Sequence, residues 1–207
     1  LKGNSKDGLI ERNLVICERF HSGQTRLGLS FGGGGTSLDS ICEDMTCTPE
    51  HENGLMRNNI IVNCPSDVGI YLNEAASSEV HHNTLFNTTG IDVRFSASSV
   101  DLRNNLLGGE IRNRDGGQST EGSNFEQVSV DDFQAWFASP AAADFTRVDG
   151  SSFVDLGEVV PAVADDYCAT LRDAMPDIGA VEYISGTLCD TTVPGGSDLV
   201  FRNGFES

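Results

Sequence analysis

Ile10-Glu11-Arg12-Asn13-Leu14-Val15 reads as an apolar residue, two polar residues, asparagine, any residue and an apolar residue. The same pattern returns in three later segments: Met56-Arg57-Asn58-Asn59-Ile60-Ile61, Val80-His81-His82-Asn83-Thr84-Leu85 and Leu102-Arg103-Asn104-Asn105-Leu106-Leu107. The asparagines are spaced at 59 − 13 = 46, 83 − 59 = 24 and 105 − 83 = 22 residues. A period in the low twenties is typical of one coil of a solenoid.

A second column of apolar residues repeats in step with the first, about ten residues further along each unit. It is carried by Leu27-Gly28-Leu29, Val68-Gly69-Ile70, Thr89-Gly90-Ile91 and Gly109-Glu110-Ile111. Val, Ile and Leu between Gly-rich or Asn-rich corners favour strands, and the polar pairs do not follow a helical period. Each unit is therefore predicted to hold at least two short strands, and the units are predicted to stack in parallel.

The repeated asparagine has a physical task in such a stack. Side-chain amides about 4.8 Å apart can hydrogen-bond from one unit to the next while they satisfy the backbone of a turn. We therefore predict that the asparagines form a structural ladder and not a catalytic site. The ladder residues are Asn13, Asn59, Asn83 and Asn105.

The 46-residue interval is interpreted as one unit with a long insertion. Residues 32–53 contain four consecutive glycines, a Ser/Thr run and two close cysteines, and they show no strand periodicity. They are predicted to form a loop that leaves a corner of the stack. A loop of this length on a rigid frame is often functional, because it can vary without disturbing the core.

Composition indicates an exported protein. Six cysteines in 207 residues are an even number, and no pattern of zinc ligands is present, so disulfides and an oxidising compartment are expected. A net charge of −18 argues against nucleic-acid partners, and no apolar stretch is long enough to span a membrane. The predicted disulfides are Cys17–Cys64, Cys42–Cys47 and Cys168–Cys189.

Outward positions of the second strand column form a candidate binding surface. Alternate strand residues face the same side, so these positions should lie in one stripe with Ser30. An aromatic ring, a carboxylate and two guanidinium groups could hold a sugar chain, although such charges also pair simply for stability. The candidate carbohydrate-binding residues are Tyr71, Asp92, Arg94 and Arg112.

Histidines and aspartates offer two further candidate sites. His81 and His82 point to opposite faces of a strand, so they are interpreted as structural, with one facing solvent and the other packed near the corner. No cofactor is required by any motif. Asp155, Asp165 and Asp166 are candidate calcium ligands, although a solvated acidic surface is the favoured interpretation of these three residues.

The second half of the chain is interpreted as a cap. Val128–Ala138 carries Phe133, Trp136 and Phe137 at helical spacing, with Ser129 or Asp131 as N-cap. This short amphipathic helix is predicted to cover the last coil and hide its strand edges, with the Trp in the core. Arg172 is predicted to pair with Asp177 or Glu182.

The repeats resemble those of right-handed parallel β-helix proteins of the pectate-lyase-like superfamily. The segment Pro176-Asp177-Ile178-Gly179-Ala180-Val181-Glu182-Tyr183 is similar to the DIGA(Y/F/V)E tail of secreted bacterial β-helix repeat proteins. The resemblance implies an all-β fold of about four or five coils with a C-terminal cap that contains one short helix. It also implies a secreted, extracellular or cell-surface protein of bacterial origin. The predicted organisation is coils in 1–116, a cap in 117–185 and a tail in 186–207.

Two functions are compatible with these features. The first is a secreted β-helix protein that binds or processes an extracellular polysaccharide; as an enzyme it would be a polysaccharide lyase or a glycoside hydrolase. The second is a structural surface protein, adhesin or filament subunit, whose coil ends, including the one near Leu1, pair head to tail with another copy of the chain. Fold alone does not choose between them.

Overall fold

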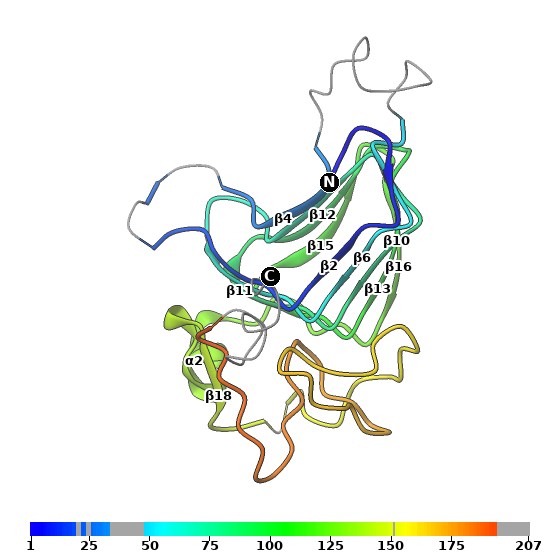
Figure 1. The fold of residues 1–207 in the computed structure, drawn as a ribbon. Coiled ribbons are helices and arrows are strands. Elements are labelled where there is room, and N and C mark those ends of the chain that lie inside the picture. The colour runs from blue at the N-terminus through cyan, green and yellow to red at the C-terminus, as the bar shows by residue number, and fades with distance from the viewer. Residues whose placement is uncertain (20–21, 24–25, 34–47, 151, 194–207) are drawn as a thin grey trace, which may run out of the picture.

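The computed structural model describes residues 1–19, 22–23, 26–33, 48–150 and 152–193. These residues are mostly β-structure, and parallel sheets dominate them (Figure 1). No described helix is long and apolar enough to cross a membrane. The predicted Cys42–Cys47 pair and most of the predicted 32–53 insertion lie outside the described residues.

Three parallel sheets run along the stack, and each takes one strand from every successive repeat. The first contains β2 (Leu9–Glu11), β6 (Leu55–Arg57), β10 (Ser78–His81), β13 (Ser99–Arg103) and β16 (Gln118–Gly122). The second contains β3 (Leu14–Ile16), β7 (Ile60–Cys64), β11 (Thr84–Thr88) and β14 (Leu106–Leu107). The third contains β4 (Leu29–Gly32), β8 (Ile70–Asn73), β12 (Gly90–Arg94) and β15 (Glu110–Arg114).

A smaller parallel sheet joins the remaining short strands of the first three repeats. It contains β1 (Ser5–Lys6), β5 (His51–Glu52) and β9 (Ala75–Ala76). Parallel pairing continues through β16 to Gly122, so the stack extends beyond the boundary expected at residue 116.

Strand register shows that the 46-residue interval is one repeat. Leu9 pairs with Leu55 at an offset of 46, whereas Leu29 pairs with Ile70 at an offset of 41. Five extra residues therefore lie between β3 and β4, where no insertion was predicted. The rest lie between the end of β4 at Gly32 and the start of β5 at His51, which agrees with the predicted loop.

The asparagine ladder is present and has one more member than predicted. Each Nδ2 donates to the Oδ1 of the asparagine in the next repeat at 2.9–3.0 Å. The backbone N–H of the donor residue reaches the same Oδ1 at 3.0–3.1 Å. One turn geometry therefore recurs at this corner. The row is Asn13, Asn59, Asn83, Asn105 and Asn124.

Every residue directly before a ladder asparagine has a left-handed backbone conformation. The φ angles lie between 51° and 55°, a region that only Gly, Asn, Asp and a few other residues tolerate readily. This backbone turns the chain sharply from the first sheet into the second. The residues are Arg12, Asn58, His82, Asn104 and Ser123.

Apolar side chains form two separate cores. Met56, Ile61, Leu72 and Val93 belong to the cluster between the sheets and are fully buried. Side chains on the opposite face of β7, β11 and β14 belong to a second cluster with the C-terminal residues. The second sheet is therefore buried on both faces, which explains its consecutive apolar residues.

Helix α2 (Val130–Trp136) contributes to that second core. Ser129, one of the two predicted N-caps, caps it by accepting a hydrogen bond from the Asp132 backbone N–H. The Phe133 ring packs against Phe86 of β11 with centroids 5.2 Å apart, and Trp136 is buried, as predicted. The expectation that the helix covers the last coil is wrong: it lies against the outer face of the second sheet (Figure 1).

Beyond α2, the chain adds β17 (Phe137–Ser139), the 3₁₀ helix η1 (Pro140–Ala142) and β18 (Asp144–Arg147). β17 and β18 pair antiparallel. Two predicted disulfides are confirmed: Cys17–Cys64 joins the first two repeats, and Cys168–Cys189 closes the C-terminal segment. Both fit an extracellular protein, since disulfides persist in oxidising compartments.

Candidate functional site

The outward side of the third sheet holds the predicted binding residues. Ser30, Tyr71, Asp92 and Arg112 are register partners and form one row across β4, β8, β12 and β15. Arg94 lies in the next outward row, where it pairs in register with Asn73 and Arg114. The structure therefore places the predicted residues on one face. We call Tyr71, Asp92, Arg94, Arg112 and Arg114 the arginine face.

Asp92 organises the middle of the arginine face. Its side chain is only 4% exposed, and it accepts a 2.7 Å hydrogen bond from Arg112 Nε and a 2.5 Å bond from an Arg114 guanidinium nitrogen. The two arginine side chains are 37% and 43% exposed. One buried carboxylate therefore fixes two guanidinium groups that remain accessible to a ligand.

Arg94 is held from two sides. Its Nε donates to Asp115 at 2.5 Å, and a terminal nitrogen donates to the Tyr71 hydroxyl at 3.2 Å. These bonds, the one to Asp115 first, raise the pKa of Arg94. The three arginines carry one more charge than the two aspartates that pair with them, in a chain whose net charge is −18.

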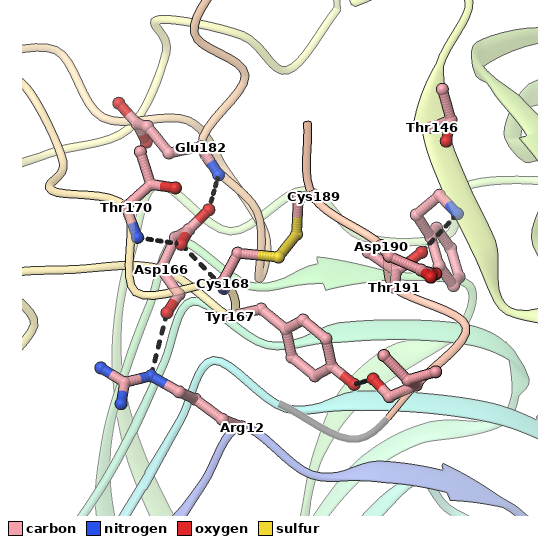
Figure 2. The surroundings of a disulfide bond; sticks show 12 residues. Arg12, Thr146, Asp166, Tyr167, Cys168, Thr170, Glu182, Cys189, Asp190 and Thr191 are labelled. Atoms are coloured by element: carbon pink, nitrogen blue, oxygen red, sulfur yellow. Dashed lines mark hydrogen bonds between the residues drawn. A yellow bond between two sulfur atoms is a disulfide. The ribbon is translucent and has the colours of Figure 1, made fainter. Parts of the chain in front are cut away.

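The predicted calcium ligands do not converge. Asp165 pairs with Arg12. The buried Asp166 carboxylate instead accepts backbone N–H bonds from Cys168, Thr170 and Glu182 (Figure 2). Within the described ranges, no group of three or more His, Cys, Asp or Glu side chains is arranged to hold a metal ion. Asp166 acts as a hydrogen-bond acceptor for the C-terminal segment.

Asp155 has a separate environment. Its backbone N–H donates to the Asp177 carboxylate at 2.8 Å, and its own side chain is exposed. Asp155 therefore helps to anchor the C-terminal segment through its backbone. The carboxylates of Asp155, Asp165 and Asp166 do not meet at one point where a calcium ion could bind.

Arg172 joins the C-terminal segment to the corner that carries the ladder. Its side chain is 3% exposed and contacts Glu182 Oε2 at 2.9 Å, which confirms one of the two predicted pairings. It also donates to Asn58 Oδ1 at 3.0 Å and to the Gly179 carbonyl at 2.9 Å. Burial lowers the pKa of Arg172 and raises that of Glu182. The pair is compensated only while both partners are present.

His82 is also buried where the C-terminal segment meets the ladder corner, and its imidazole is neutral there. Its Nδ1 lies 3.2 Å from the Asp177 carbonyl and its Nε2 lies 2.8 Å from Asn104 Nδ2. The amide of Asn104 is a donor, so Nε2 is an acceptor and Nδ1–H is the donor. Burial, followed by the positive charge of Arg172, lowers the pKa of His82 from 6.5 to about 2.

The lowered pKa of His82 predicts that the free energy of unfolding depends on pH. A base whose pKa is lower in the folded state binds fewer protons there, so stability is lost as the pH falls below the unfolded pKa of 6.5. The expected loss between pH 7 and pH 5 is about 2 kcal/mol from His82. The raised pKa values of Asp166, Asp177 and Glu182 act in the opposite direction.

The variant His82→Asn isolates the effect, because asparagine occupies the equivalent corner positions 58 and 104. Urea titrations at pH 7 and pH 5 should show a smaller loss in the variant than in the native chain, by about 2 kcal/mol. Equal losses in both chains would show that His82 does not control the acid sensitivity.

His81 differs from its predicted position. It was expected that one histidine would face solvent, but His81 is 1% exposed and its Nε2 lies 3.0 Å from Glu79 Oε2. Residues 159–162 cover this part of the first sheet. A cavity of about 320 Å³ lies here, and its lining comprises residues 159–162 and the side chains of Glu79, His81, Asp101 and Arg103. Burial lowers the pKa of His81.

Sequence reasoning missed this cavity. Glu79 pairs in register with Asp101, and His81 with Arg103, so the repeat itself aligns the four polar residues. The 22-residue spacing could have indicated their proximity, but no local signal indicated that 159–162 would form the opposite wall. Both carboxylates have partners, because Asp101 accepts from Arg103 Nε at 2.8 Å.

The chain was also compared with known proteins. Neither protein-family models, curated proteins nor solved structures give a match.

Proposed function

We propose that this chain is an extracellular right-handed parallel β-helix that binds a polysaccharide along the arginine face. The fold proposal is supported by three parallel sheets whose strands succeed one another at each repeat. The two described disulfides support an extracellular location. The tail motif around Asp177 supports a secreted bacterial origin through its resemblance to that class of proteins.

One observation carries the binding proposal. In a strongly acidic chain, the third sheet brings three arginines and a tyrosine together on neighbouring strands, with their side chains partly exposed. Guanidinium groups bind carboxylate and hydroxyl oxygens through several fixed N–H donors. Because Tyr71, Arg94 and Arg114 lie on three successive strands, which are about 4.8 Å apart, they suit a ligand that extends along the stack.

The test is binding to a panel of neutral, carboxylated and sulfated polysaccharides by biolayer interferometry. The double variant Arg94→Gln/Arg112→Gln should weaken binding to any bound polymer by at least about tenfold, equivalent to one charge-assisted contact. Arg103→Gln is the matched control, because Arg103 is paired and 32% exposed but lies on the first sheet. Equal affinity of the double variant and the native chain would contradict the proposal. Shortening of the polymer during incubation would extend it from binding to cleavage.

Assembly through the repeat ends is a second candidate function. Leu9 and Leu27, which lie on or beside the outermost strands, are 51% and 41% exposed. Leu1 occupies part of this end, since it exchanges hydrogen bonds with Ser30 and Gly32 on the edge of β4. At the other end, Glu126 accepts the backbone N–H of Ile111 at 2.7 Å. Light scattering of the unliganded chain decides this candidate: multimers would support it and monomers would exclude it.

A further inference from the structure

Phe95 occupies a backbone position that disfavours its side chain. It follows β12 directly and has a φ angle of 68°. Glu74 and Asp115 stand at the equivalent corners of the neighbouring repeats, with φ angles of 55° and 51°. The stack therefore imposes a left-handed residue here, and a bulky side chain in this region is strained.

This aromatic residue differs from others with the same backbone. Among the described non-glycine residues with positive φ, it has the only large hydrocarbon side chain. The strain is not compensated by burial in a core, because Phe95 belongs to neither apolar cluster and is partly exposed. Asparagine would fit this corner with less strain. A residue that strains the backbone at a partly exposed position indicates a role for the ring itself.

The ring borders the arginine face. The guanidinium carbon of Arg94 lies 4.6 Å from the centre of the Phe95 ring. The same guanidinium donates to the Tyr71 hydroxyl and to Asp115. Stacking on an aromatic ring restricts the orientation of a guanidinium group. Phe95 therefore brings an apolar surface directly beside groups that can hydrogen-bond to a sugar.

We propose that Phe95 is the residue on which a pyranose ring of the polysaccharide packs. The C–H groups on one side of a pyranose form an apolar patch, which gains free energy when it leaves water and covers an aromatic ring. Arg94 and Tyr71 then face the oxygens at the rim of the same sugar. This inference rests on the proposed polysaccharide binding, and it assigns the sugar-ring contact to Phe95.

The test compares Phe95→Asn and Phe95→Tyr with the native chain on a polysaccharide that the native chain binds. Phe95→Asn should weaken binding at least about tenfold, while the melting temperature stays the same or rises, because the backbone strain is relieved. Phe95→Tyr retains the ring and should bind within about twofold of the native chain. This combination separates ligand contact from packing, because a packing residue would lower the melting temperature when removed.

Two outcomes would overturn the inference while the proposed function stands. One is unchanged affinity of Phe95→Asn alongside lost affinity of Arg94→Gln/Arg112→Gln. The other is a large fall in the melting temperature of Phe95→Asn, which would identify Phe95 as a packing residue. If the native chain binds no polysaccharide of the panel, the proposed function fails and this inference fails with it.

Discussion

Asn83→Ala is expected to lower the free energy of unfolding by about 3–5 kcal/mol, because several buried polar groups lose their partners together. Asn83 is fully buried. Its Oδ1 accepts from both the backbone N–H and the side chain of Asn59, and its Nδ2 donates to Asn105 Oδ1 at 3.0 Å and to the His81 carbonyl at 3.1 Å. No water can replace these contacts without opening the corner.

Asn13→Ala is the matched control at the end of the same ladder. Asn13 is exposed and bonds to only one neighbouring ladder residue, Asn59. Its replacement should cost about 1 kcal/mol or less, since solvent reaches the groups that it leaves. Both values can be read from urea unfolding at pH 7. Similar losses for the two variants would contradict the view that the ladder stabilises the interior of the stack.

Arg172→Met should destabilise the chain by about 3–5 kcal/mol, because it leaves a buried carboxylate without its counter-charge. Arg172 and Glu182 are 3% and 2% exposed, so solvent does not screen their contact. The variant also removes the donor to Asn58 and to the Gly179 carbonyl, which connects the C-terminal segment to the second repeat. The segment that contains Asp177 and Glu182 should therefore loosen first.

Two variants control for this experiment, again by urea unfolding. Arg103→Met removes an arginine whose ion pairs are about one-third exposed, and it should cost about 1 kcal/mol or less. Glu182→Gln combined with Arg172→Met should recover part of the loss, because the uncompensated charge disappears. A cost of Arg172→Met as small as that of Arg103→Met would show that the buried pair does not anchor the segment.

Much of the repeat architecture could be predicted because it is encoded in local periodicity. The asparagine spacing identified four ladder members, but Asn124 was missed because Glu121 stands where the pattern requires an apolar residue. The extra residues between β3 and β4 were also missed. The 46-residue asparagine interval counts them together with the later insertion, and only the offset of 41 in the third sheet shows where they lie.

Packing of the C-terminal segment was less predictable. The helix around Phe133 and its Ser129 cap follow from local sequence, but the surface that the helix covers depends on contacts far along the chain. A signal was available, since Ile60-Ile61-Val62 is continuously apolar, which indicates a strand buried on both faces. The wall that 159–162 forms over His81 had no comparable signal.

The arginine face was predictable in part from the sequence. Tyr71, Asp92 and Arg112 were placed in one row because strand residues alternate between faces, and the register shows that row. The sequence did not indicate that Arg114 would share Asp92 with Arg112, since that depends on side-chain geometry. Nor did it single out Phe95, whose strained backbone is visible only in the structure.

Each successive repeat adds one strand to each parallel sheet, and a distance between two spin labels tests this stacking most directly. Leu9, Leu55, Glu79, Asp101 and Thr120 are successive register partners in the first sheet. Labels at positions 9 and 120, both exposed, are separated by four strand steps, or about 19 Å between backbones. Pulsed electron–electron double resonance should give a distance distribution with one narrow peak near this value. A peak beyond about 30 Å, or a broad distribution, would contradict the stacking.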